Sequence, residues 1–219
     1  MRRWLREAWD LVGADLPLFS VAAFLTISLS LLSAFILAVP LAVGMCIMFL
    51  EKLQGRPPEL RQLWEGLTQH FPASILIYIV TMLVSIPFDL ANYFLQSRPT
   101  PWPHLGILIV LAGLWLIGTP LFFCLPLIAD RDLSAREALQ LSWSRVRAQP
   151  LAVFAAVVTC SLVLLFGVFA CGLGIIITLP LVIATLVLAY RDLVGNFAAP
   201  QMTSLGYGNP DEVANNEEH

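Results

Sequence analysis

The chain has 219 residues, of which 58% are hydrophobic and only 12% are charged. That charged share is about half of what soluble globular domains carry, and a soluble core could not enclose so much apolar surface. The composition excludes an ordinary soluble domain and predicts an all-α, polytopic integral membrane protein. The formal net charge of −3 says little about partners, because four of the acids lie in the last nine residues. No basic cluster indicates a nucleic acid partner, and we expect none.

Four charge-free runs are each longer than the roughly 20 residues with which an α-helix crosses a bilayer. They cover residues 16–50, 66–88, 99–129 and 148–190. The first run has 35 residues and would be about 52 Å long as one helix, so it is expected to hold two short spans. The last run is longer still, and Gly172 and Gly174 can supply a turn between its two spans.

Single crossings near residues 73–93 and 105–128 bring the expected total to six. With the N-terminus inside, eleven of the twelve Lys and Arg residues lie on the cytoplasmic side, and only Arg98 lies outside. Lys and Arg near span ends resist translocation, so this bias predicts that both termini are cytoplasmic. Residues 1–195 are expected to form a single transmembrane helical domain. Residues 196–219, rich in Asn, Gly, Pro and acid, are expected to form a mobile acidic tail.

A tryptophan followed by a proline recurs three times along the chain. Trp9 precedes Pro17 by eight residues, Trp64 precedes Pro72 by eight, and Trp143 precedes Pro150 by seven. Each Trp lies in an amphipathic stretch, and the third stretch opens with Ser134 and Glu137 in capping-box spacing. In a second series, Pro-Leu pairs at positions 40, 120 and 180 each stand eleven residues before a charged residue. The two series predict three repeated hairpins, each preceded by a cytoplasmic interfacial amphipathic helix.

The interfacial helices carry the main candidate site. The candidate docking residues for anionic lipid or an acidic partner are Trp64, Trp143, Arg136, Arg145 and Arg147. Trp143 is expected on the membrane face of a helix over 134–147, together with Ala135 and Ala138. Arg136 and Arg147 are expected on the opposite side, with Arg145 on the flank. Ordinary anchoring in the membrane explains the same residues.

Asp89 is the one carboxylate within a predicted span, and burying a carboxylate in lipid is costly unless it is paired or hydrated. It is therefore a candidate ion or proton site. Its position seventeen residues after Pro72, about 25 Å along a helix, favours an interfacial residue or a local cap instead. No catalytic, cofactor-binding or metal-ligating pattern is found, because the three histidines are scattered and no cysteines form a Cys-x-x-Cys pair.

Several short motifs occur in a distinctive order. They are Val39-Pro40-Leu41-Ala42-Val43-Gly44, Gly55-Arg56, Leu63-Trp64-Glu65-Gly66-Leu67, Pro126-Leu127-Ile128-Ala129-Asp130, Ala138-Leu139-Gln140-Leu141-Ser142-Trp143, Gly172-Leu173-Gly174, Leu179-Pro180-Leu181 and Tyr190-Arg191-Asp192-Leu193. Through them the chain resembles a group of uncharacterised bacterial multi-span membrane proteins related to the membrane domain of glycerophosphoryl diester phosphodiesterases, over roughly residues 40–195. The resemblance implies a multi-span helical fold in the bacterial cytoplasmic (inner) membrane, without an established activity. No phosphodiesterase catalytic domain accompanies it, so the resemblance implies no enzymatic chemistry.

These features favour a non-catalytic membrane protein, either an accessory or scaffold subunit or a lipid-associated organiser, over an enzyme. The expected partners are anionic membrane lipids and another membrane protein or complex. The alternative is a small transporter or lipid-translocating protein, because repeats and proline-broken spans are common in transporters. Against that alternative, the predicted spans hold almost no polar groups to line a route.

Overall fold

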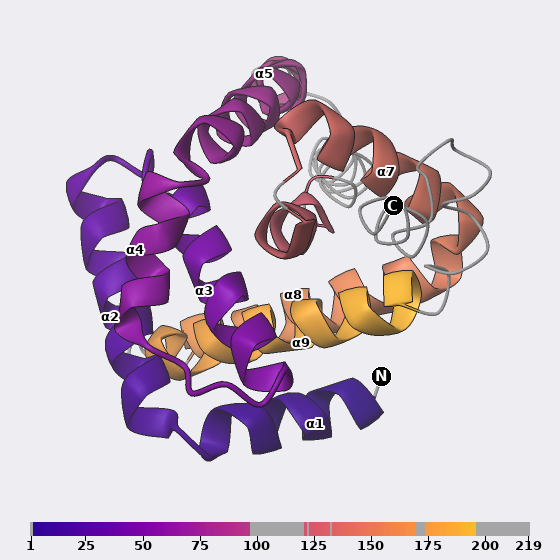
Figure 1. The fold of residues 1–219 in the computed structure, drawn as a ribbon. Helices are drawn as coiled ribbons and strands as arrows, with labels where there is room; N and C mark the ends of the chain where they lie inside the picture. Colours follow the sequence, from indigo (N-terminus) through magenta and orange to yellow (C-terminus); the bar gives the residue numbers. More distant parts are fainter. Residues whose placement is uncertain (1, 97–120, 122, 132, 170–173, 196–219) are drawn as a thin grey trace, which may run out of the picture.

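The computed structural model describes residues 2–96, 121, 123–131, 133–169 and 174–195, and all regular secondary structure in these ranges is helical (Figure 1). The helices are α1 (Arg2–Gly13), α2 (Leu16–Leu32), α3 (Ala38–Leu53), α4 (Leu60–Thr68), α5 (Phe71–Gln96), α7 (Ala135–Ala148), α8 (Pro150–Phe169) and α9 (Ile175–Gly195). Residues 121 and 123–131 are helical as well and are called the 123–131 helix below. The all-helical fold expected from composition is confirmed for this part of the chain.

In the part of the chain that the structure describes, three helical stretches are long and apolar enough to cross a membrane: Phe71–Ala91, Pro150–Phe169 and Ile175–Leu193. A fourth is added if α1 and α2, which meet at a bend of 96°, form one broken span. The two long charge-free runs, residues 16–50 and 148–190, each hold two helices, as their lengths predicted. Most of the crossing predicted for residues 105–128, and the glycine turn at 172–174, lie outside the described residues.

Caps and prolines explain where several helices begin. Ser134 is the N-cap of α7, where its Oγ accepts a hydrogen bond from the Glu137 N–H and its own N–H donates to the Glu137 carboxylate, so the predicted capping box is confirmed. Pro150 is the first residue of α8, where no helical hydrogen bond is lost. Pro180 lies inside α9, where its missing N–H removes one helical hydrogen bond.

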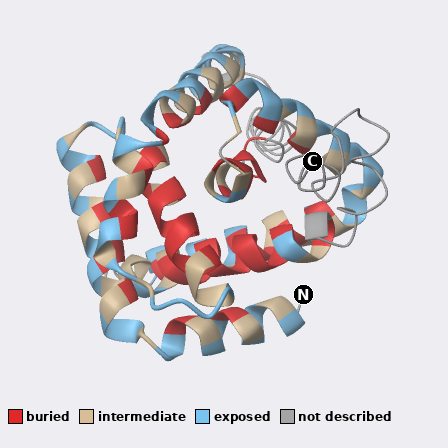
Figure 2. Cartoon of the chain, in the orientation of Figure 1, coloured by how far each residue is buried: buried red, intermediate tan, exposed pale blue. Residues whose placement is uncertain are grey.

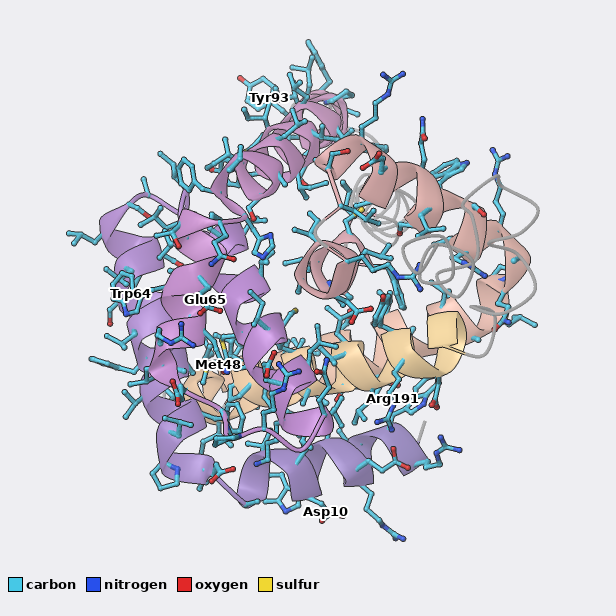
Figure 3. The ribbon with its side chains drawn as sticks, in the orientation of Figure 1. Asp10, Met48, Trp64, Glu65, Tyr93 and Arg191 are labelled. Carbon is cyan, nitrogen blue, oxygen red and sulfur yellow. The ribbon has the colours of Figure 1, made fainter. Side chains whose placement is uncertain are left out.

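The core is built mainly by three helices. Residues 43–50 of α3, residues 123–124 and 126–128 of the 123–131 helix and residues 180–190 of α9 are buried (Figure 2). In contrast, α2, α5 and α8 expose large apolar side chains such as Phe24, Leu83 and Phe166. Figure 3 shows the same contrast, with Met48 of α3 inside and Tyr93 of α5 on the outer side. An apolar exterior around a buried set of helices is typical of a protein that lipid surrounds.

The short amphipathic helices pack against these core helices. Gly66 of α4 lies on Gly44 of α3 so closely that a Cβ at Gly66 would meet the Pro40 carbonyl oxygen at 2.5 Å. α1 lies along α9 (Figure 1), where Trp4 Nε1–H donates to Asp192 Oδ2 at 2.7 Å and Arg3 Nη2 lies 2.9 Å from the same oxygen. α1 and α9, far apart in the sequence, are therefore neighbours in space.

Candidate membrane and partner interface

α7 has two distinct faces. Ala135, Ala138 and Ser142 are buried against the rest of the protein. Arg136, Gln140, Trp143 and Arg147 are exposed and follow one another at spacings of four, three and four residues, which places them on one stripe of the helix. The prediction that Trp143 shares a face with Ala135 and Ala138, opposite Arg136 and Arg147, is wrong. The alanines cover protein, and Trp143 lies between the two arginines.

The exposed stripe of α7 combines an aromatic ring with positive charge. The Arg147 guanidinium lies over the Trp143 ring, 5.1 Å from its centroid, which is a cation–π arrangement. Trp143 keeps 41% of its surface exposed. Among the described residues, neither Arg136 nor Arg147 forms an ion pair with a carboxylate. The stripe therefore presents two positive charges beside a tryptophan.

Arg145 belongs to a different environment. Burial lowers the pKa of the Arg145 guanidinium most, and the positive charge of Arg131 lowers it further. The nearby Tyr190 raises the pKa. Tyr190 donates its hydroxyl to Asp130 Oδ2 at 2.7 Å, and Arg131 Nε lies 3.9 Å from the same oxygen. Arg145 is thus close enough to Arg131 and Tyr190 to interact with them electrostatically, and it is not part of the exposed stripe that holds Arg136 and Arg147.

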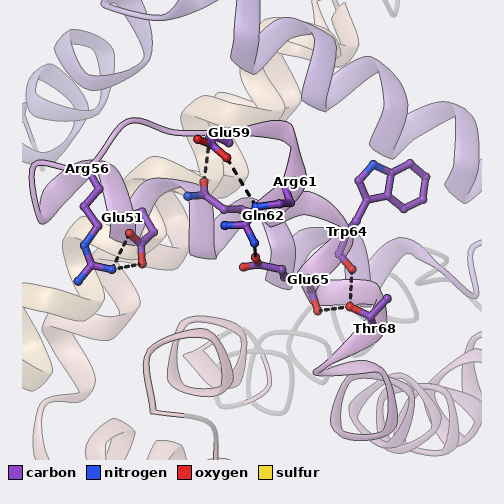
Figure 4. Close-up of polar contacts among 8 residues, drawn as sticks. All are labelled: Glu51, Arg56, Glu59, Arg61, Gln62, Trp64, Glu65 and Thr68. Atoms are coloured by element: carbon purple, nitrogen blue, oxygen red, sulfur yellow. Dashed lines mark hydrogen bonds and ion pairs between the residues drawn. The ribbon is translucent and has the colours of Figure 1, made fainter.

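α4 presents its tryptophan without unbalanced positive charge (Figure 4). Trp64 is 48% exposed, and Arg61 beside it lies 2.9 Å from Glu65 and 3.6 Å from Glu59. Arg56 is paired with Glu51 at 3.0 Å. Such exposed pairs add little stability, but they neutralise the positive charges near Trp64. The positive charges of Arg136 and Arg147 on α7 have no such neutralising partner among the described residues.

A third exposed tryptophan lies on α1. Trp9 is 55% exposed, close to the values for Trp64 and Trp143. The residue just before each tryptophan, Ala8, Leu63 or Ser142, is fully buried. The repeat pattern in the sequence marked Trp9, but the predicted docking set omitted it.

Asp89 stands apart from every other predicted site residue. It is exposed on α5, and the helix continues beyond it to Gln96, so Asp89 does not cap the helix end. Within the described ranges, no group of three or more His, Cys, Asp or Glu side chains could hold a metal ion. The structure brings no second ionisable partner to Asp89 in this part of the chain.

Several hydroxyl groups buried or half-buried in the apolar helices are occupied by their own backbone. Thr26, Thr159 and Thr185 each donate to the carbonyl four residues earlier, at 2.7–2.8 Å. No charged side chain is buried in the described residues. These helices therefore offer few polar groups that could coordinate a solute.

Comparison with known protein families gives a match. The family described as "Membrane domain of glycerophosphoryl diester phosphodiesterase" matches residues 86–199, just over half of the chain. The match begins within α5 and includes the whole of α7, α8 and α9. No curated protein and no solved structure matches the chain.

Proposed function

This chain belongs to the family of the membrane domain of glycerophosphoryl diester phosphodiesterase, and we propose that it is a non-catalytic scaffold or accessory subunit that gathers anionic lipid at the bacterial cytoplasmic membrane. The observation that carries this proposal is the exposed stripe of α7, in which Arg136, Trp143 and Arg147 lie together without acidic partners among the described residues. A tryptophan beside arginines suits the headgroup region of a membrane. The indole ring prefers the membrane–water interface, and the guanidinium groups can bind lipid phosphates.

The proposed architecture is three copies of one unit: an interfacial helix, a helix that runs outward and a helix that returns. The buried residue before an exposed tryptophan, found in α1, α4 and α7, supports this division. So does the sequence, since residues 129–133 read Ala-Asp-Arg-Asp-Leu and residues 189–193 read Ala-Tyr-Arg-Asp-Leu. Both copies of this motif begin nine residues after the proline of a Pro-Leu pair.

Contacts between equivalent positions also support the three-unit arrangement. Asp130 and Tyr190 occupy the same position in their motifs and are hydrogen-bonded to each other. Residues at equivalent positions meet in this way only near an axis that relates the copies. The third equivalent, Leu50, is buried in α3. α1 packs on α9 in the way that α4 packs on α3. In both pairs an interfacial helix contacts the returning helix of another unit, so the contact of α1 with α9 closes the three units into a ring.

The proposed topology places both termini and the three tryptophan-bearing helices on the cytoplasmic side, with six membrane-inserted helices between them. The positive-inside bias of the sequence supports this orientation. The ion pair of Asp15 with Lys52 and the contacts of Asp192 with Arg3 and Trp4 would then lie at one membrane surface. A scaffold role is favoured over a transporter because the buried helix surfaces offer so few free polar groups.

Lipid retention tests the docking role of α7. We would purify the Arg136→Gln/Arg147→Gln variant in mild detergent and quantify co-purifying phospholipids by headgroup with mass spectrometry. Each arginine near an anionic surface contributes about 1 kcal/mol, so losing two should lower the affinity for anionic lipid about 30-fold at low salt. The matched control, Arg136→Lys/Arg147→Lys, keeps the charge and should keep most of the lipid. If the Gln variant retains as much anionic lipid as the wild type, the docking role is wrong.

A further inference from the structure

The first hairpin, α2 and α3, is short for a membrane crossing. Its helices have 17 and 16 residues, or about 25 Å each, while the hydrocarbon layer is about 30 Å thick. The polar end of the hairpin is fixed, because Lys52 Nζ at the end of α3 lies 2.5 Å from Asp15 Oδ2 and 2.6 Å from the Leu11 carbonyl oxygen. With that anchor at a membrane surface, a helix of about 25 Å falls about 5 Å short of the far boundary of the hydrocarbon layer.

The tip of the hairpin, residues 31–37, is apolar and exposed on the protein surface. It reads Leu-Leu-Ser-Ala-Phe-Ile-Leu, without a charged residue. Leu32 is 86% exposed, and Leu31, Phe35 and Ile36 are exposed too. Transfer of each large apolar side chain out of water is worth about 1.5–3 kcal/mol, so this surface favours lipid over water.

The backbone N–H groups of the tip are paired inside the hairpin. Each N–H from position 33 to position 38 donates within the hairpin, to Leu29 O, Leu31 O, Ser30 O, Ser33 O, Ser33 Oγ and Phe35 O in that order, at 2.6–3.2 Å. The Ser33 hydroxyl in turn donates to the Ser30 carbonyl at 3.2 Å. An unpaired backbone group in hydrocarbon costs several kcal/mol, so the pairing of these N–H groups lowers the cost of placing the turn inside a bilayer.

This pairing is achieved at strained backbone positions. Ala34 and Phe35 have φ of 50° and 67°, a region that glycine or asparagine usually fills. The other end of α3 shows the usual solution: Gly55 takes φ of 81° in a polar turn between Gln54 and Arg56. The tip instead keeps apolar side chains at strained positions, which fits an environment of acyl chains.

We propose that the α2–α3 tip ends inside the hydrocarbon layer, covered by lipid acyl chains, and does not emerge into water on the outer side. The first hairpin is then re-entrant, and the chain still returns to the cytoplasmic side before α4. This proposal goes beyond the lipid-docking role and does not depend on α7. It replaces two of the six crossings that the sequence predicts.

Cysteine accessibility tests the proposal. We would place single cysteines at Leu32→Cys, Gln54→Cys and Thr100→Cys and treat intact cells, inside-out vesicles and detergent-solubilised protein with a membrane-impermeant maleimide. Cys46, Cys124 and Cys160 are buried, and the unsubstituted parent protein gives the background labelling. Leu32 is suitable because its exposed side chain contributes little to internal packing.

The expected pattern separates this proposal from the overall topology. Thr100→Cys should react in intact cells and Gln54→Cys only in inside-out vesicles, as the charge bias predicts. Leu32→Cys should stay unlabelled in both and react at least ten-fold faster in detergent. Labelling of Leu32→Cys from either side overturns the proposal, as does continued protection in detergent, which would mean that protein covers the tip. If Gln54→Cys or Thr100→Cys reacts from the wrong side, the proposed orientation of the membrane helices is contradicted. The lipid-docking measurement on α7 would be unaffected.

Discussion

Glycines at helix crossings decide, residue by residue, how closely these helices approach. A Cβ at Gly66 would collide with the backbone of Gly44 and Pro40, and backbone atoms cannot rotate aside. At the crossing of α8 with α9, a Cβ at Gly167 would meet side-chain atoms of Thr178 instead of backbone. Small residues at such points let helices pack at close range in a bilayer, where dispersion replaces much of the hydrophobic drive.

Gly66→Ala should therefore destabilise the protein, by about 1–3 kcal/mol, because one added methyl group forces α4 away from α3. Thermal unfolding in detergent, followed by circular dichroism, would measure this loss. Gly13→Ala is the matched control, since a Cβ there meets nothing within 4 Å. An equal effect of the two substitutions would contradict the proposed steric cause.

At the scale of elements, helix boundaries were more predictable than helix faces. The capping box at Ser134 and the division of residues 16–50 into two helices follow from local chemistry and length, and both are confirmed. The orientation of Trp143 was predicted wrongly, although its spacing of seven residues from Arg136 and four from Arg147 already places the three on one stripe. Apolar periodicity itself marks a face without saying whether protein or lipid covers it. Arg145 needed tertiary information too, since its neighbours Arg131 and Tyr190 come from other helices.

The stability of the first turn of α7 should depend on pH. The side chain and then the backbone N–H of Ser134 donate to Glu137 and lower the pKa of its carboxyl group below the ordinary value of 4.5. A lowered folded-state pKa means that this stabilisation is complete above the ordinary value and is lost as the pH falls through the lowered one. The stability difference between wild type and Glu137→Ala should accordingly be constant near neutral pH and shrink below about pH 4. Hydrogen exchange of α7 would follow this change.

Glu137→Gln is the control for that measurement. Glutamine can still accept from Ser134 in a capping box but carries no charge, so the stability of α7 in this variant should vary less with pH. A pH response in Glu137→Gln as large as that of the wild type would assign the effect to another titrating group.

At the scale of the whole molecule, the contact of α1 with α9 joins the two ends of the described chain. Ala8 and Val12 of α1 are buried in the same apolar cluster as Leu188 of α9. Asp192 adds the polar contacts, as both Arg3 and Trp4 donate to its carboxylate. In the proposed three-unit ring the α1–α9 contact is equivalent to the α3–α4 contact. It joins distant parts of the sequence, since 188 residues separate Trp4 from Asp192.

Asp192→Ala should loosen α1 selectively. Hydrogen bonds to a charged group are worth about 1.5–3 kcal/mol, and partial exposure at this site points to the lower value, which corresponds to roughly ten-fold faster amide exchange in α1. Exchange in α4, which is held through Gly44 and Gly66, should stay unchanged. Glu7→Gln is the matched control, because Glu7 pairs with Arg3 within α1 and leaves Asp192 its two donors. If α1 exchanges at the wild-type rate in a folded Asp192→Ala protein, apolar packing alone closes the ring; if α4 loosens with it, the ring unfolds as one cooperative unit.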